Sequence, residues 1–154
     1  MTQTQMSLTD TELLATAAQL SDAFSDRAIE FDQARRLSQD ASDAMARAGF
    51  YRLFVPEYLG GLEASPLVGA KIFERLAQGN AACGWVAFIA ATSGSTLGSI
   101  PQDTARAIFS HPNTMVAGVF APTGKATIKA GEVTVEGRWQ WGVRHPKCRL
   151  DTGW

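Results

Sequence analysis

The sequence predicts a mainly α-helical protein with a β segment at its C-terminal end, and two features of the pattern carry this prediction. From about residue 10 to residue 110, apolar side chains recur at helical spacing. After His111-Pro112-Asn113 the period changes to the alternation that is typical of strands. Helices followed by strands suit an α+β protein or two domains. We expect a helical domain over residues 1–112, the first strands of a β domain over 113–142, and a separate tail over 143–154.

Two helices are predicted before Gly49. Thr9 or Asp10 is expected to cap the first, and its helical pattern continues to about Leu37. Its buried stripe would be Leu13, Ala17, Leu20 and Phe24. Ser38 is expected to cap the second helix, which Gly49 would end in a left-handed conformation that a β-carbon disfavours. The buried face of that helix would be Ala41, Ala44, Met45 and Ala48.

A buried connector and three more helices are expected next. The apolar stretch 50–55 should enter the core, and Gly60-Gly61 should turn the chain. Ser65-Pro66 has the residues of an N-cap and a first helical position. That helix is apolar on two faces, which predicts deep burial in a complete fold and an exposed second face in a truncated chain. Asn80 would cap the next helix, through Ala91, and Pro101 would open a short helix that ends near Ser110.

Three short strands follow in the pattern. Residues 114–121 read as a strand, Pro122-Thr123-Gly124 as a turn, and 126–129 and 133–136 as two half-exposed strands. About 40 residues of β pattern are too few for a sheet with a core of its own.

Composition and charge exclude several kinds of function. The chain of 154 residues has a formal net charge of −1, and its Lys and Arg are scattered, so no electrostatic feature favours nucleic acid or an anionic membrane. Its most apolar stretch, 81–91, is far shorter than the ~20 residues that span a bilayer. Cys83 and Cys148 form no Cys-x-x-Cys motif, and His111 and His145 show no metal-ligand spacing, so we expect reduced thiols, no metal site and a cytoplasmic protein.

Four segments, in this order, resemble the N-terminal part of the acyl-CoA dehydrogenase-like flavoprotein superfamily. They are Ala48–Leu62, Ala77 with Ala81–Trp85, Gly118–Gly124 and Gly137–Trp141. The resemblance implies an N-terminal helical domain plus the start of the middle β domain, with the family's C-terminal four-helix bundle absent from this chain. In the family, that bundle supplies the catalytic base, much of the substrate pocket and the tetramer interface.

The segment 120–126 is informative about the branch of the superfamily. Dehydrogenases proper usually read TEP-x-AGSD at this flavin loop, whereas this chain reads Phe-Ala-Pro-Thr-Gly-Lys-Ala. The pattern is more similar to two-component flavin-dependent monooxygenases. That resemblance implies an oxygenation of an aromatic or heterocyclic substrate by reduced flavin and O2, with a partner flavin reductase. It leaves open whether the flavin is FAD or FMN.

The resemblance also implies which residues bind the cofactor. They are Phe120, Ala121, Pro122, Thr123 and Trp141. Backbone groups and the Thr123 hydroxyl would make the polar contacts, and Trp141 would pack near the flavin ring. No catalytic residue is assigned, because the catalytic base comes from the bundle. We therefore expect the fragment to be inactive and to bind flavin weakly or not at all.

The tail after Gly142 departs from the family pattern. The family expects Ser-Gly-Thr-Gln-Asn-Ala there, but the chain reads Val-Arg-His-Pro-Lys-Cys. Codons for the tail permit the family motif in the +1 frame, so one hypothesis is a frameshift at this point. Two other interpretations stay open: a fragment of an acyl-CoA dehydrogenase, or a non-catalytic helical interaction module. Trp85 is expected in the core.

Overall fold

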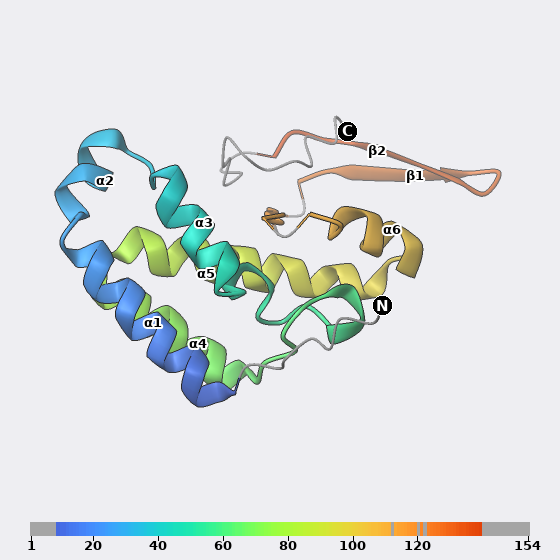
Figure 1. Ribbon diagram of the computed structural model, residues 1–154. Helices are drawn as coiled ribbons and strands as arrows, with labels where there is room; N and C mark the ends of the chain where they lie inside the picture. Colours follow the sequence, from blue (N-terminus) through green and yellow to red (C-terminus); the bar gives the residue numbers. More distant parts are fainter. Residues whose placement is uncertain (1–8, 112, 120, 122, 140–154) are drawn as a thin grey trace.

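A computed structural model describes residues 9–139 of the chain apart from 112, 120 and 122. Its α-helices are α1 (Asp10–Ser25), α2 (Ala28–Ala34), α3 (Gln39–Arg47), α4 (Pro66–Gly79), α5 (Ala81–Ser95) and α6 (Gln102–Ile108). Three 3-10 turns, η1 (Phe50–Arg52), η2 (Glu57–Leu59) and η3 (Thr96–Ser99), and two strands, β1 (Lys125–Lys129) and β2 (Glu132–Glu136), complete the described elements. Helices α1 and α4 lie side by side, α4 also packs against α5, and the two strands form a hairpin beyond α6 (Figure 1).

Local cap chemistry begins α1 where the sequence predicts. The Thr9 side chain accepts a hydrogen bond from the Glu12 amide at 3.3 Å, and the Glu12 carboxylate accepts one from the Thr9 amide at 2.8 Å. This capping box satisfies two amides that a helix start leaves without partners. The predicted stripe is confirmed at Leu13, Ala17 and Phe24, which are buried, while Leu20 is half-buried.

The expected single helix to about Leu37 is wrong, because the chain leaves the helix at Arg27 and forms the separate α2. The Arg27 guanidinium donates hydrogen bonds to Glu30, Ser38 and Asp40 and so ties α2 to the start of α3. Ser38 is the N-cap residue of α3 as predicted. Its hydroxyl accepts a hydrogen bond from Arg27, however, and none from a backbone amide of the helix. The same guanidinium holds the pKa of Asp40 well below its ordinary value.

The connector after α3 is confirmed as a buried stretch between two glycine turns. Gly49 has a φ of 78° and Gly60 a φ of 79°, both in the left-handed region. A β-carbon on Gly61 would lie 1.9 Å from the Val55 carbonyl oxygen, so only glycine fits. Amides of residues 62–64 donate to carbonyls of 52, 53 and 55 at 2.7 to 3.1 Å and close the connector on itself.

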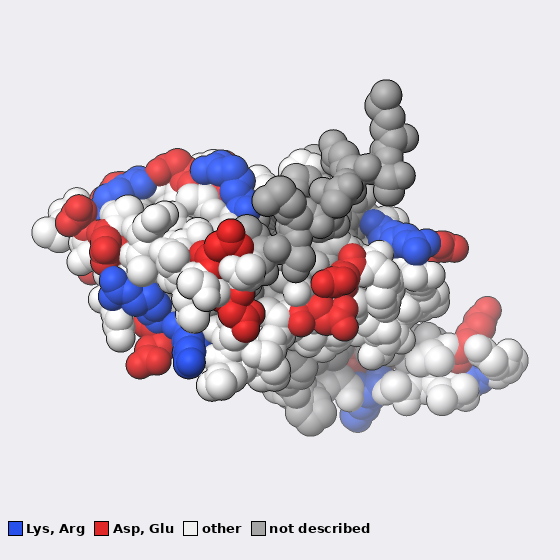
Figure 2. All heavy atoms as spheres, turned by 60° about the horizontal axis from the view of Figure 1, so that its bottom comes forward, with Lys and Arg blue, Asp and Glu red and all other residues white. Residues whose placement is uncertain are grey.

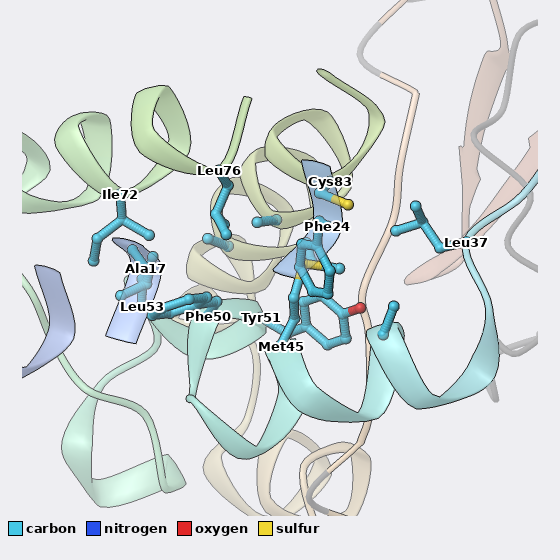
Figure 3. Close-up of a cluster of buried hydrophobic side chains, with 14 of the residues drawn as sticks. Ala17, Phe24, Leu37, Met45, Phe50, Tyr51, Leu53, Ile72, Leu76 and Cys83 are labelled. Carbon is cyan, nitrogen blue, oxygen red and sulfur yellow. The ribbon is translucent and has the colours of Figure 1, made fainter. Parts of the chain in front are cut away.

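The main core lies between α1, α3, α4, α5 and the connector (Figure 3). Its largest fully buried side chains include Met45, Phe50, Leu53, Ile72 and Leu76. The predicted buried face of α3 is confirmed at Ala41 and Met45, but Ala44 and Ala48 are only half-buried.

Both predicted caps of the α4–α5 pair are confirmed. Ser65 accepts from the Val68 amide at 3.3 Å, with Pro66 at the first helical position, and Asn80 accepts from the Ala82 amide at 3.0 Å. The two helices approach closely at Gly84, where a β-carbon would lie 2.7 Å from the Phe73 carbonyl oxygen. The second apolar face of α4 is largely open, as expected for this chain without the rest of the fold. Its members Ala70 and Ala77 are exposed, and Phe73 is half-buried.

Helical turns continue past the expected end of α5 at residue 91. The run Ala81–Ser99 is long and apolar enough to cross a membrane by length and composition, with a mean hydropathy of 1.2. A core helix of a soluble protein passes the same test, and this helix buries its small residues against α4 and the connector.

The β segment differs from the prediction in two ways. The described residues of 114–121 form no strand, and the backbone of 116–119 makes no hydrogen bond to another described residue. A strand needs a neighbouring strand, and the pattern alone does not supply one. The antiparallel β1–β2 hairpin is confirmed, but every residue in both strands is exposed. One face of it is apolar, with Ala126 paired to Val135 and Ile128 to Val133.

Candidate functional site

The segment that leads from the helices to the hairpin carries most of the predicted cofactor residues, and its first part is firmly attached. Thr114 and Met115 are 5% exposed, and Val116 packs against a second small core of Val55, Leu59, Ala105 and Phe109. The Thr114 hydroxyl donates to the Ile108 carbonyl oxygen at 3.1 Å. The Asn113 side chain donates to the Asp43 carboxylate in α3, also at 3.1 Å.

Arg52 makes a second set of long-range polar contacts to this region. Its Nη2 donates to the carbonyl oxygens of Phe109, at 3.1 Å, and of His111. The guanidinium carbon lies 5.0 Å from the centre of the Phe109 ring, within cation–π range. Its Nε is buried and has no hydrogen-bond partner among the described residues. Burial lowers the pKa of the Arg52 guanidinium from its ordinary value, because desolvation disfavours the charge.

Of the predicted cofactor residues, Ala121 and Thr123 are described, and both are exposed. Phe120, Pro122 and Trp141 lie outside the described residues. The Thr123 amide donates to the Ala121 carbonyl oxygen at 2.9 Å, and the Thr123 hydroxyl donates to the Arg138 carbonyl oxygen at 3.3 Å. A hydroxyl has one donor and two acceptor lone pairs, so this bond leaves the Thr123 oxygen able to accept another hydrogen bond.

Trp139 closes the base of the hairpin beside Thr123. A β-carbon on Gly124 would lie 2.5 Å from the Trp139 ring, and one on Gly137 would lie 2.7 Å from it. The two glycines therefore give the indole a flat backbone surface to cover. Trp139 remains 40% exposed, so the base of the hairpin presents a hydroxyl, backbone groups and an aromatic ring together.

A second surface consists of aromatic side chains on α4, α5 and the connector, and we call it the aromatic row: Phe54, Phe73, Phe88 and Trp85. Neighbouring rings have centroids 5.6 to 5.9 Å apart, and the pairs that involve Phe73 are edge-on. The expected burial of Trp85 is wrong, since 53% of it is exposed. Helical spacing placed it on an apolar helix, but it lies at the exposed end of the aromatic row, beside Phe88.

Two titratable side chains of the helical core, Cys83 and Tyr51, are buried. The Cys83 thiol is fully buried, and burial raises its pKa to about 12, which leaves little reactive thiolate at neutral pH. The Tyr51 hydroxyl shares a 2.9 Å hydrogen bond with Ser42, and burial raises the pKa of Tyr51 as well. Among the described residues, no group of three His, Cys, Asp or Glu side chains has metal-binding geometry. Figure 2 shows acidic and basic side chains scattered over one face, with no basic stripe in view.

Sequence reasoning missed Arg52 as a site residue. A signal was present, because Arg52 is the one charged residue in the apolar stretch Phe50–Val55. A charge inside a buried stretch has to reach partners elsewhere, but the sequence alone does not say where.

Comparison with known proteins identifies a family that the sequence matches. Residues 9–123 match the family model described as acyl-CoA dehydrogenase, N-terminal domain. The match ends at Thr123, the last of the predicted cofactor residues in that segment.

Two curated relatives are named as monooxygenases. The chain is 37% identical over 125 residues to the indole-3-acetate monooxygenase of Pseudomonas putida, which covers 79% of this chain and 32% of that protein. It is 28% identical over 117 residues to the oxygenase subunit HsaA, a flavin-dependent monooxygenase of Rhodococcus jostii, covering 75% and 31%. The chain thus spans about a third of the length of these relatives.

A solved structure supports the same likeness. The crystal structure of the HsaA monooxygenase from M. tuberculosis superposes with a TM-score of 0.77 at 26% identity. The match covers 88% of this chain and 36% of that one. The helical arrangement and the start of the β segment are therefore shared with a monooxygenase of this kind.

Proposed function

The chain belongs to the acyl-CoA dehydrogenase family, and from this premise we propose that it is the N-terminal part of a flavin-dependent monooxygenase. The complete protein would oxygenate an aromatic or heterocyclic substrate with reduced flavin and O2. The observation that carries the proposal is the 37% identity to an indole-3-acetate monooxygenase over 79% of this chain. As the 154-residue chain alone, the protein would lack activity.

The residues present at the hairpin base suit one edge of a flavin. Flavin sites need a flat apolar surface with a few fixed polar groups. The small, exposed Ala121 allows close approach, the Thr123 oxygen can accept a hydrogen bond, and Trp139 supplies an aromatic surface nearby. Phe120, Pro122 and Trp141 would complete this edge. When bound, the flavin would supply the electron transfer to O2, and the chain's part would be to hold and orient the ring.

The partners follow from the same proposal. The name of the Rhodococcus relative, an oxygenase subunit, supports a second component, and a flavin reductase would deliver the reduced cofactor. FAD and FMN are both compatible with the residues named. The complete protein would be a cytoplasmic homotetramer whose interface lies largely in the C-terminal bundle. Nucleic acid and membranes are not expected as partners.

The experiment that tests this proposal starts with the coding DNA beyond codon 142. The expected result is a +1 frame that encodes Ser-Gly-Thr-Gln-Asn-Ala, followed by a long helical C-terminal domain. The protein made from that frame should bind reduced flavin and, with a flavin reductase, NADH and O2, convert indole-3-acetate or a related aromatic acid to a product heavier by one oxygen. Acyl-CoA-dependent reduction of the bound flavin, with no oxygenated product, would instead support a dehydrogenase and refute the proposal.

A further inference from the structure

The connector places one charged side chain at the junction between the helical core and the segment that leads to the hairpin. Tyr51 and Leu53, which flank Arg52, are at most 2% exposed. The Arg52 amide donates to the Gly49 carbonyl oxygen at 2.9 Å, and the Arg52 carbonyl oxygen accepts from the Leu62 amide at 3.0 Å. The backbone of Arg52 is therefore fixed by its own turn and by the chain that returns from the glycine pair.

The side chain of Arg52 spans from this fixed point to a distant part of the sequence. Its two carbonyl partners, in Phe109 and His111, lie 57 and 59 residues further along the chain. Phe109 is the C-cap residue of α6, where helix carbonyls lack helical partners and carry the negative end of the helix dipole. His111 lies two residues beyond, and its carbonyl oxygen also accepts from the Thr114 amide at 3.1 Å. A cation there is stabilised electrostatically, and its stacking on the Phe109 ring fixes the plane of the guanidinium.

Other contacts also hold this junction, and the apolar side chains of Phe109, Met115 and Val116 pack in the two cores. The Asn113–Asp43 hydrogen bond is exposed, as is the Arg52–His111 bond, so water competes with both, whereas the Arg52–Phe109 bond is partly buried. The Thr114–Ile108 hydrogen bond joins residues only six apart and does not tie the junction to the core. Among the described residues, Arg52 is the charged group that connects the core to residues 109–111, immediately before the segment with Ala121 and Thr123.

We propose that Arg52 is a positioning residue for the flavin edge: its guanidinium fixes the backbone at 109–111 and thereby sets where the segment with Ala121 and Thr123 leaves the helical core. The effect on flavin rests on the proposed function, because it assumes that this segment contacts the flavin. Its structural part, the fixing of residues 109–119 by Arg52, is independent of any cofactor.

The test compares three variants with the unmodified chain by hydrogen–deuterium exchange, followed by mass spectrometry of peptides that cover residues 105–119. Arg52→Met keeps the length of the side chain and removes its donors, and Arg52→Lys keeps the charge but not the planar fork. Arg47→Met, at an exposed position in the last turn of α3, is the matched control. We expect exchange of the hydrogen-bonded amides in 105–119, which include those of Phe109, Ser110 and Thr114, to rise ~10-fold or more in Arg52→Met, to rise less in Arg52→Lys, and to stay unchanged in Arg47→Met.

A uniform rise across α1 and α4 as well would show a general role in stability and overturn the proposal. So would unchanged exchange in 105–119. If neither Arg52 variant folds, the unmodified chain still decides the matter by NMR. Slow rotation about the Arg52 Nε–Cζ bond is expected for a pinned guanidinium, and free rotation would refute it.

A second readout separates this proposal from the proposed function. In the protein made from the repaired frame, Arg52→Met should weaken the binding of reduced FAD or FMN while Arg52→Lys restores part of it. If the unmodified repaired protein binds neither flavin, the proposed function fails while the exchange result stands. If it binds flavin and Arg52→Met binds equally well, the positioning role fails alone.

Discussion

Replacement of Gly84 by alanine sets helix propensity against packing, and the structure decides which effect is larger. Alanine in a helix interior is favoured over glycine by about 0.8–1.0 kcal/mol, so propensity alone predicts a more stable protein. In the structure, the added β-carbon would lie 2.7 Å from the Ala77 β-carbon, 2.7 Å from the Phe73 carbonyl oxygen and 2.9 Å from the Ala77 amide nitrogen.

The magnitude follows from what has to move. Carbon atoms in contact prefer roughly 3.5–4.0 Å, so α4 and α5 must separate by about 1 Å at this point. Two of the three close atoms belong to the α4 backbone, which cannot change rotamer. Overpacking of this kind typically costs about 1–3 kcal/mol, and rigid backbone neighbours favour the upper part of that range. After the gain in propensity is subtracted, we expect Gly84→Ala to destabilise the protein by about 1–2 kcal/mol.

The assay is unfolding followed by circular dichroism at 222 nm, by heat and by urea. For a helical part of about 100 residues, a loss of 1 kcal/mol lowers Tm by roughly 4–8 °C. The matched control is Gly98→Ala in η3, where the nearest atom to an added β-carbon is 3.7 Å away and the change should be within about 0.5 kcal/mol. A Gly84→Ala protein that melts at or above the temperature of the unmodified chain would refute the close approach of α4 and α5.

Three further outcomes are expected. Cys83 should react with a thiol reagent only after unfolding. Because the pKa of Cys83 in the folded protein, about 12, exceeds the ordinary value of 9.0, the free energy of unfolding should fall as pH rises above about 9. Denaturant titrations at pH 8 to 11 measure this decline. Loss of the capping box by Thr9→Ala should cost about 1 kcal/mol, and an unchanged urea midpoint would contradict it. Phe50→Ala should cost about 3–5 kcal/mol, whereas Trp85→Ala, at a position 53% exposed, should cost clearly less; equal losses would mean that Trp85 is buried after all.

Local chemistry made the helix boundaries around the connector predictable. Ser65-Pro66, Asn80 and Gly49 each act through bonds or backbone angles within a few residues, and each has the role that its type predicts. The break at Arg27 was missed because no glycine or proline marks it. It depends on ion pairs and hydrogen bonds with Glu30, Ser38 and Asp40, which a local pattern does not reveal.

Features that depend on distant partners were predicted less well. Trp85 sits on an apolar helix, but which face of that helix is covered depends on how α4 and the connector pack. Residues 114–121 have the composition of a strand, yet a strand needs a neighbour to bond with. The cofactor residues were placed by resemblance alone, and the structure locates Ala121 and Thr123 at an exposed hairpin base. The role of Arg52 could be recognised only from the fold, which brings the carbonyl groups of residues 109 and 111 next to its side chain.

The two-faced hairpin has a consequence for how the protein behaves in concentrated solution. Its apolar face, with Ile128, Val133 and Val135 at 52–74% exposure, covers nothing among the described residues, and neither strand has a second neighbour there. Such a ribbon is a template for strand addition by other chains. The opposite face pairs Lys125 with Glu136 and Lys129 with Glu132, so its charges cancel and give no net repulsion between two hairpins. Aggregation should therefore increase with protein concentration, with β1 and β2 as its seed.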